Sequence, residues 1–433
     1  MTRKTDAGIL VAIFIAGIFA IEAQTPFIHG QGVTFVVDDD GLDTFCLDQY
    51  NGGEAPDFNT INDAIGAAAS GDTIIVCPGT YAEHVVITAG KTDLTLLGFG
   101  CSRTIIDPPG ASNAISILAD GTTIDGFEIT GGINGIESSS GDEIDFTMIK
   151  HNCIHDNTAD GIHFDEGSEN IIRNNDIFSN GDEGVFFGVL GSTSDMNWIG
   201  NNEVHDNGTN GIAMQDDSST GNEINGNKVR DNGIGFWGID VDSDILVKSN
   251  KVISNDGGIL ARGDGNTFLR NTSNENAKEG FRTIDIMSSL NIFDKNTAKG
   301  NGEQGFSDKG TMNTFTGNTA KMNTLQGFLI TGTDGVFTDN AARKNTLQGL
   351  LITGDDGVFD GNRARNNGDD GFEVDAASSG NSFESNKSNL NGAFGFLDAS
   401  VGGTGDFGTD NFYDSNTCNG NTSGDSSPAD LCT

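Results

Sequence analysis

The sequence has few of the side chains that stack on sugars or attract polyanions. Of its 433 residues only two are Trp and three are Tyr, the aromatic residues with a polar edge that sugar-binding platforms present. Lys and Arg together number 23 against 63 Asp and Glu, which gives a net charge of −40. Because such a charge repels nucleic acid and anionic membrane surfaces, we expect no nucleic acid as a partner.

Long apolar runs are also missing, except at the N-terminus. Arg3 and Lys4 precede an apolar run over residues 7–21, and Ala23 follows it. This run is short for a bilayer span but typical of a signal peptide, so we predict that residues 1–23 are removed on export. An uncleaved membrane anchor is the alternative. We therefore expect a secreted, extracellular or cell-surface protein with no membrane span after signal cleavage.

No Cys-x-x-Cys spacing occurs, which argues against a zinc site. All six cysteines lie after residue 23, and an even number in an exported chain favours disulfide bonds. Proximity in the sequence favours Cys46–Cys77, which would join the entry helix to the first turn of the fold. It also favours Cys418–Cys432, which would hold the C-terminal tail in place.

The sequence does contain one pattern repeated twelve times between residue 149 and the C-terminus. Each copy has an apolar residue, two variable positions, Asn, four further positions and a second Asn. The first Asn of each copy is Asn152, Asn175, Asn202, Asn227, Asn250, Asn271, Asn296, Asn318, Asn340, Asn362, Asn386 or Asn416. A repeat of this length indicates a stacked solenoid, in which no copy buries its apolar face alone.

Two positions in each copy change together along the chain. Three residues before the first Asn, the side chain is aliphatic from Ile149 to Val247 and aromatic from Phe268 to Tyr413. Two residues after that Asn, Ile or Val gives way at the same copy to Ser, Ala or Cys. A large ring beside a small residue conserves volume, as expected of two columns that share one close-packed interior.

A Gly followed by an apolar residue comes four positions after the second Asn in most copies, for example Gly161-Ile162 and Gly327-Phe328. Gly allows the backbone to turn, and the apolar residue begins the next inward-facing strand. The short runs between turns alternate with period two and lack the i, i+3, i+4, i+7 spacing of a helix. They predict an all-β fold, a parallel β-helix.

These copies resemble the repeat of the right-handed parallel β-helix (pectin-lyase-like) superfamily. The resemblance implies that the Asn columns form an asparagine ladder, in which stacked amides hydrogen-bond along the solenoid axis. It also implies that residues 57–106 form the N-terminal entry, with Phe58, Ile61, Ile65 and Ala68 on one face of a short capping helix. The expected divisions are 1–23 signal peptide, 24–148 cap and first irregular rungs, 149–415 regular repeats, and 416–433 C-terminal cap or tail.

Many members of that superfamily act on polysaccharides, but none of their complete catalytic sets is present. The Gly-His-Gly segment of galacturonan hydrolases is missing. Asp107 is followed by Pro108 and Pro109, whereas alginate epimerases have Asp-Pro-His. Residues 79–83 share the GTYAE entry of pectin methylesterases without their later catalytic segments.

Outward-facing residues of the early copies form a candidate catalytic site. If the Gly-apolar pair marks the inward phase, the second and fourth residues after the Gly point outward. These positions include His163, Asp165, Asp240, Asp242, Arg262 and Arg282, and Asp216 lies close to them in the sequence. Neighbouring rungs place such groups about 5–10 Å apart, a range that glycosidase carboxylate pairs use. An Arg among carboxylates also suits β-elimination from uronates, and the alternative is an ordinary salt-bridged outer sheet.

Two further motifs bear on ligands. Asp38, Asp40 and Asp43 in VDDDGLD surround a Gly turn, a pattern typical of an oxygen-liganded calcium site, although no cofactor is required. Four Asn-x-Ser/Thr sequons coincide with the Asn columns, where an inward-facing amide cannot carry a glycan: Asn207, Asn271, Asn386 and Asn421.

Together these features predict an exported β-helix protein with a structural or surface-interaction role, which contacts polysaccharide or cell-envelope components. The alternative is a carbohydrate-active enzyme of the pectin-lyase-like type, a polysaccharide lyase or a glycoside hydrolase.

Overall fold

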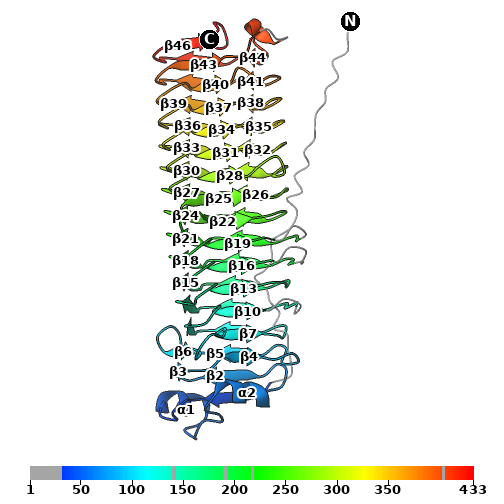
Figure 1. Cartoon of the computed structure of the whole chain (residues 1–433), viewed down its shortest axis with the longest axis vertical. Coiled ribbons are helices and arrows are strands. Elements are labelled where there is room, and N and C mark those ends of the chain that lie inside the picture. The colour runs from blue at the N-terminus through cyan, green and yellow to red at the C-terminus, as the bar shows by residue number, and fades with distance from the viewer. Residues whose placement is uncertain (1–31, 139–142, 189–193, 216–218, 402–404) are drawn as a thin grey trace.

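The computed structural model describes residues 32–138, 143–188, 194–215, 219–401 and 405–433. Within these ranges each turn of the chain, or rung, contributes one strand to each of three parallel sheets (Figure 1). The sheets contain 16, 15 and 15 strands, and neighbours in each sheet are generally three strands apart in sequence. The predicted all-β parallel β-helix is therefore confirmed. The predicted signal peptide and Asp216 lie outside the described residues.

The three sheets run the length of the molecule. The first sheet consists of β1 (Thr34–Val37), β2 (Thr73–Val76), β5 (Thr95–Leu97), β8 (Thr123–Asp125), β11 (Met148–Lys150), β14 (Ile171–Arg173), β17 (Trp198–Gly200), β20 (Glu223–Asn225), β23 (Leu246–Lys248), β26 (Thr267–Leu269), β29 (Ile292–Asp294), β32 (Thr314–Thr316), β35 (Val336–Thr338), β38 (Val358–Asp360), β41 (Ser382–Glu384) and β44 (Phe412–Asp414). The second sheet consists of β3 (Gly79–Tyr81), β6 (Thr104–Ile106), β9 (Glu128–Thr130), β12 (Cys153–His155), β15 (Asp176–Phe178), β18 (Glu203–His205), β21 (Lys228–Arg230), β24 (Lys251–Ile253), β27 (Thr272–Asn274), β30 (Thr297–Lys299), β33 (Thr319–Lys321), β36 (Ala341–Arg343), β39 (Arg363–Arg365), β42 (Lys387–Asn389) and β45 (Thr417–Asn419). The third sheet consists of β4 (Val85–Ile87), β7 (Ile115–Ile117), β10 (Ile136–Ser138), β13 (Ile162–Phe164), β16 (Val185–Phe187), β19 (Ile212–Met214), β22 (Trp237–Val241), β25 (Gly257–Ala261), β28 (Phe281–Thr283), β31 (Phe306–Asp308), β34 (Phe328–Ile330), β37 (Leu350–Ile352), β40 (Phe372–Val374), β43 (Phe394–Asp398) and β46 (Gly424–Ser427).

Asparagine side chains hold neighbouring rungs together at the turns. The backbone amide and Nδ2 of Asn175 donate to Oδ1 of Asn202 at 3.0 and 3.1 Å, and Nδ2 also donates to the Ile149 carbonyl at 2.9 Å. The same arrangement recurs along the column from Asn152 to Asn416, and the second Asn column forms a parallel ladder. Every amide thereby satisfies polar groups that the interior would otherwise leave unpaired.

A third ladder, which was not predicted, occupies the turn between the third and first sheets. It is interrupted, and its members include Asn170, Asn197, Asn222, Asn266, Asn291, Asn313, Asn381 and Asn411.

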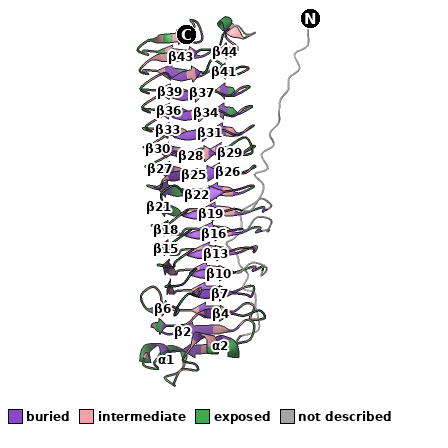
Figure 2. Cartoon of the chain, in the orientation of Figure 1, coloured by how far each residue is buried: buried purple, intermediate pink, exposed green. Residues whose placement is uncertain are grey.

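Buried residues continue along the whole coil (Figure 2), and the core side chains change in type along the axis, as the columns predicted. In the first two sheets, the inward columns up to Val252 are Ile and Val, whereas later rungs bury stacked Phe rings beside Ala or Ser. Phe293 stacks on Phe315 with ring centroids 4.4 Å apart, and Phe306 of the third sheet meets Phe315 edge-on at 6.2 Å. These two contact types are the geometries that aromatic rings prefer.

Helices cover the N-terminal end of the coil (Figure 1). The predicted capping helix is α2 (Ile61–Ala67), which buries Ile61 and Ile65 against the first rungs and receives a cap from Thr60 Oγ1. Phe58 and Ala68, which were predicted on the same helix, lie just outside it: Phe58 forms a β-bridge with Val37, and Ala68 is the C-cap. A second helix, α1 (Thr44–Tyr50), was not predicted. Its N-cap is Asp43, whose Oδ1 accepts from the Cys46 backbone amide at 2.8 Å.

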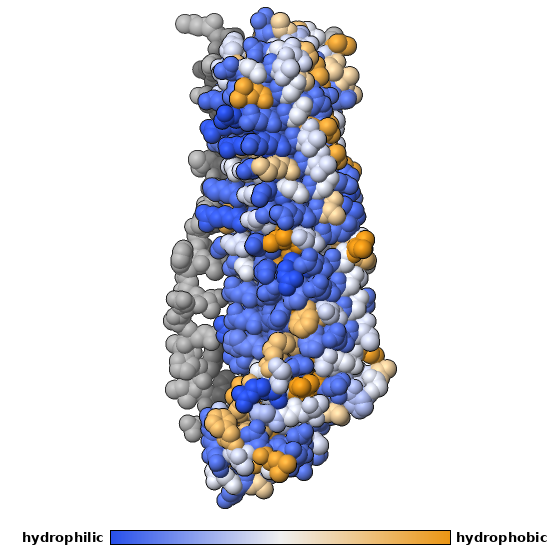
Figure 3. Space-filling view, turned by 90° about the vertical axis from the view of Figure 1, so that its left-hand side faces the viewer, coloured by the Kyte–Doolittle hydropathy of each residue, from blue (hydrophilic) through white to orange (hydrophobic). Residues whose placement is uncertain are grey.

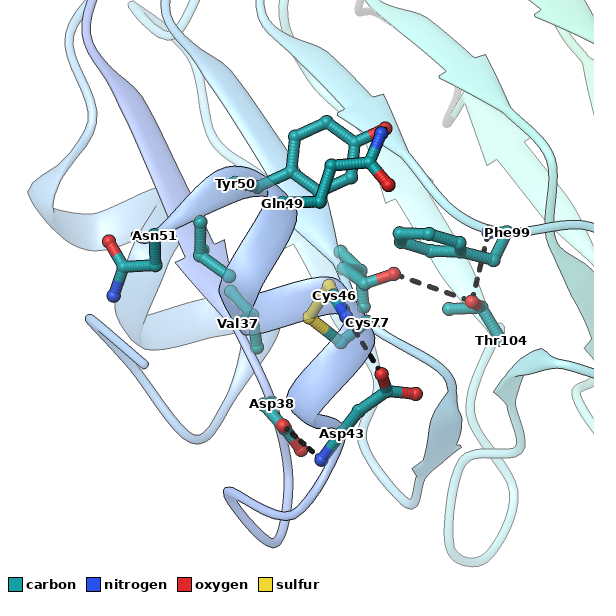
Figure 4. The surroundings of a disulfide bond; sticks show 12 residues. Val37, Asp38, Asp43, Cys46, Gln49, Tyr50, Asn51, Cys77, Phe99 and Thr104 are labelled. Carbon is teal, nitrogen blue, oxygen red and sulfur yellow. Dashed lines mark hydrogen bonds between the residues drawn. A yellow bond between two sulfur atoms is a disulfide. The ribbon is translucent and has the colours of Figure 1, made fainter. Parts of the chain in front are cut away.

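Three disulfides stabilise the two ends of the coil. Cys46–Cys77 joins α1, and not the predicted helix α2, to the end of β2 (Figure 4). Cys418–Cys432 holds the tail, and Cys101–Cys153 links early rungs. Both predicted pairings are confirmed. Each bridge restricts the unfolded chain and so raises the free energy of unfolding.

Candidate functional site

The candidate residues lie on the outer face of the third sheet. The middle residue of a typical three-residue strand there points away from the core, because alternate residues face opposite sides. The strand register places these residues in one outward column: Glu137, His163, Phe186, Ala213, Asp240, Leu260 and Arg282. The second residue after the Gly of each Gly-apolar pair therefore points outward in the structure, as predicted.

His163 is held between two carboxylates. Its Nδ1 lies 2.5 Å from Asp160 Oδ2 and its Nε2 lies 2.9 Å from Asp165 Oδ1. On the next rung, the Phe186 ring stacks on the imidazole with centroids 4.9 Å apart. Burial alone would lower the pKa of His163, but the hydrogen bonds and charges of the two carboxylates outweigh it and raise the pKa to about 9. The imidazole is thus a cation at neutral pH.

Glu183, one rung further along, is the carboxyl group beside this cluster. Burial, together with the nearby charge of Asp160, raises the pKa of Glu183 to about 7. Its backbone amide donates to Asp160 Oδ1 at 2.8 Å, and its Oε1 accepts from Asn210 Nδ2 at 3.3 Å. A carboxyl group that is half protonated near neutral pH is suited to donating or accepting a proton.

Asp240 and Arg262 form a closed pair on a separate part of the column. Asp240 is fully buried, and its carboxylate accepts bonds from Arg262 Nε at 2.7 Å and Nη2 at 2.6 Å. Burial raises the pKa of the Asp240 carboxyl against the effect of this partner. Asp242, at the end of the same strand, is also buried, and its charge helps to raise the pKa of Arg262 after the bonds to Asp240.

The guanidinium of Arg282 forms an ion pair with Glu279. Its Nη1 lies 3.3 Å from Oε1 of Glu279, a residue that is itself buried. Three rungs, or about 14 Å at the usual strand spacing, separate His163 from Asp240. The six candidate residues therefore form three local groups and not one constellation: His163 with Asp165, Asp240 with Asp242 and Arg262, and Arg282 with Glu279.

The acidic turn near the N-terminus uses its carboxylates partly for its own backbone. Oδ1 of Asp38 accepts from the Gly41 amide at 3.1 Å and Oδ2 accepts from the Asp43 amide at 3.1 Å. The ligand oxygens of Asp38, Asp39 and Asp40 lie within 4.8 Å of one another, whereas Asp43 caps α1. Oxygen ligands at this spacing suit calcium, which here stays a prediction.

A second acidic group lies on the third sheet at the C-terminal half. Asp369, Asp370 and Glu373 also bring their oxygens within 4.8 Å, and Gln348 Nε2 donates to Glu373 Oε2 at 2.5 Å. Burial raises the pKa of Asp370 to about 6. Gln348 ends a ladder in which Gln304 donates to Gln326 and Gln326 donates to Gln348.

Comparison with known proteins agrees with the rungs and ladders. Residues 103–251 and 288–427 match the family described as the right handed beta helix region, which is more than half of the chain. The chain belongs to the right-handed β-helix family. Within the part of this β-helix protein that the structure describes, we found no helix with the length and apolar character to cross a membrane.

A cell surface glycoprotein of Methanothermus fervidus is 30% identical to this β-helix protein over 257 residues. The match covers 51% of this chain and 42% of the relative, so the chain spans less than half the length of that relative.

Two solved structures share the general form at low identity. The alginate lyase from Paenibacillus sp. str. FPU-7 has 18% identity and a TM-score of 0.48, covering 64% of this chain and 96% of that one. The A-module of an Azotobacter vinelandii mannuronan C-5 epimerase has 15% identity and a TM-score of 0.46, covering 92% and 95%. Likeness of this degree carries no information on the activity of this β-helix protein.

The residues that surround His163 were not among the predicted site residues. Asp160 and Glu183 each stand immediately before the Gly of a Gly-apolar pair, and Glu137 is the outward neighbour of His163 on the preceding rung. A recurring polar residue before that Gly was the available signal. Its members are Asn134, Asp160, Glu183, Asn210, Glu279, Gln304, Gln326, Gln348 and Asp370.

The four asparagines of the Asn-x-Ser/Thr sequons lie in the asparagine ladders, as predicted. Asn207, Asn271 and Asn386 are buried, with at most 2% of each residue exposed, and their amides bond to neighbouring rungs. Asn421, at the end of its ladder, is partly exposed and donates from Nδ2 to the Ser388 carbonyl at 3.1 Å.

Proposed function

We propose that this β-helix protein is exported and serves at the cell surface as a rigid scaffold that contacts glycans or other envelope components. One observation carries the proposal. Asp240, Arg262 and His163, the central candidates for catalysis, are each held by partners within the chain. A carboxylate that is fully buried and clamped by a guanidinium has no free face to offer a substrate.

Three further observations support this role. Three disulfides favour an oxidising compartment outside the cytosol. The relative from Methanothermus fervidus is named a cell surface glycoprotein. Ladders that continue from rung to rung also give a stiff rod, because opening one rung unpairs polar groups on both neighbours.

The test is to incubate the purified protein with a panel of uronate and neutral glycans, with and without Ca²⁺. We expect binding without new reducing ends or unsaturated products. Product formation that is lost in Asp242→Asn and retained in Asp294→Asn would overturn the scaffold proposal. Asp294 is the matched control because it ends a first-sheet strand, away from the third-sheet column.

A carbohydrate-active enzyme is the second candidate, and Glu183 is the observation that favours it. Its carboxyl group, with a pKa raised to about 7 by burial and by Asp160, lies one rung from the His163 cation. In this role Glu183 would be the general acid. Turnover of a glycan that falls in Glu183→Gln, with a pH profile whose limb near 7 disappears, supports this candidate. Unchanged turnover in that variant would exclude Glu183 from the reaction.

A further inference from the structure

The outer face of the second sheet carries a row of cations in the later rungs. In strands β30 to β42 the middle residue is buried and the two flanking residues point outward. Six outward positions and one adjoining turn hold Lys or Arg, and we call them the basic stripe: Lys299, Lys321, Arg343, Lys344, Arg363, Arg365 and Lys387. The register places Lys299, Lys321, Arg343 and Arg365 directly opposite one another on successive rungs.

No residue in the described part of the chain neutralises the stripe. None of its seven side chains forms an ion pair or donates a hydrogen bond to another described residue. Earlier on the same sheet, by contrast, Lys228 and Arg230 both contact Glu203, at 2.7 and 3.0 Å. Like charges directly opposite in a sheet repel one another, and in the stripe no ion pair with a described residue offsets this repulsion.

Figure 3 looks onto this side of the molecule, and its most hydrophilic groups are stacked along the upper half. Seven of the 23 Lys and Arg of a chain with net charge −40 are concentrated in the stripe. A surface tuned only for solubility would spread its few cations among the acids.

The first sheet carries the opposite charge near the C-terminal end, on the last two rungs of the stripe and on the rung that follows them. Asp360, Glu384 and Asp414 are the last residues of β38, β41 and β44, and they lie directly opposite one another on successive rungs. We call these three residues the acidic column. None of them forms an ion pair with a cation among the described residues. Both rows therefore repeat with the rung spacing, about 4.8 Å.

We propose that the basic stripe of one copy docks on the acidic column of a second copy, with the two coils side by side and parallel. Because both rows share one axial repeat, a displacement of one rung along the axis sets all three acids opposite stripe residues, and this fixes the register of the contact. The two surfaces differ, so the contact is heterologous and adds further copies into a row. This inference goes beyond glycan contact, and its failure would leave the proposed scaffold role standing.

Analytical ultracentrifugation of the whole protein at low salt tests the docking. Wild type should associate with rising concentration, and added salt should abolish association because it screens exposed charges. Arg343→Glu/Arg365→Glu reverses two charges of the stripe, and Asp360→Asn/Glu384→Gln/Asp414→Asn neutralises the column, so each variant alone should be monomeric. Mixed together they retain one intact stripe and one intact column, and they should form a one-to-one dimer and nothing larger.

The control is Lys248→Glu/Lys251→Glu, which makes the same change in net charge outside the stripe and should associate like wild type. Circular dichroism checks that every variant keeps its β-sheet spectrum. Association of the stripe variant at the wild-type level would overturn the proposal. So would a wild type that stays monomeric at low salt and instead binds polygalacturonate through the stripe, since the occupant would then be a glycan.

Discussion

Earlier and later rungs enclose the same interior with different side chains. Up to Val252 both inward columns of the first two sheets are aliphatic, whereas from Phe268 one column is a stack of rings and the other is Ala or Ser. The strand register continues across the change without interruption. The backbone path is therefore set by ladders and turns common to both regions, and volume is exchanged between columns within that path.

The outer faces of the two regions also differ. First-ladder Asn residues are evenly 22 residues apart from Asn296 to Asn362, and on these rungs cations at the same strand position form the basic stripe. Earlier rungs are uneven in length, and there His163, Asp160 and Glu183 gather into a cluster. The strand register is continuous in both regions, so the rows and the cluster differ in which side chains stand at the outward positions.

The largest expected effect is in the aromatic core. Phe315→Ala should lower the free energy of unfolding by about 3–5 kcal/mol, because it leaves a ring-sized cavity among Phe293, Phe306 and Phe337. Ile199→Ala at the matching position of an earlier rung should cost about 2–5 kcal/mol. Chemical denaturation measures both variants.

A coupled substitution sharpens this difference. In Phe315→Ile/Ala320→Val the second change refills volume that the first removes, so the double variant should be more stable than the sum of the single changes predicts. Thr314→Ala, at a partly exposed neighbouring position, is the control and should change stability by about 0.5 kcal/mol or less. A Phe315→Ala effect under about 1 kcal/mol would contradict the inward position of that column.

Much of this division was predictable from the sequence, because the columns repeat and each copy reinforces the last. Phe315 and Ala320 are buried as their columns required. By contrast, β1 and α1 occur once, so no repeat revealed them, and Cys101–Cys153 pairs cysteines too far apart for sequence proximity to select. The candidate site was predicted as one group, but rung distance separates its members.

Loss of one ladder asparagine should have the next largest effect on stability, and this effect should be equal in the earlier and later rungs. Oδ1 of Asn202 and of Asn340 accepts two hydrogen bonds from the preceding ladder Asn. Nδ2 of each donates to a backbone carbonyl and to Oδ1 of the next ladder Asn. Asn202→Ala and Asn340→Ala should therefore both cost about 2–3 kcal/mol, the penalty for buried groups left unpaired. Asn389→Ala, on the outer face of β42, is the control and should be nearly neutral. A loss confined to one region would show that the ladders do not contribute equally.

The smallest effect depends on pH and belongs to the earlier rungs, since all six His residues precede residue 206. The folded pKa of His163, raised to about 9 by two carboxylates against the effect of burial, lies above the unfolded value of 6.5. Its stabilising contribution is therefore complete below pH 6.5 and is lost as the pH rises through about 9. Wild type should lose on the order of 1–2 kcal/mol over that window, measured by denaturation at pH 6 and pH 10.

Two variants separate His163 from other titrating groups. His163→Gln should flatten the loss between pH 6.5 and 9 and leave the losses at lower pH unchanged. Glu183→Gln should act in a different window, because a carboxyl pKa raised from 4.5 to about 7 destabilises the fold as the pH rises through that range. Hydrogen exchange should localise both effects to rungs near β13 and β16, whereas equal loss of protection in the phenylalanine rungs would contradict a contribution specific to the earlier region.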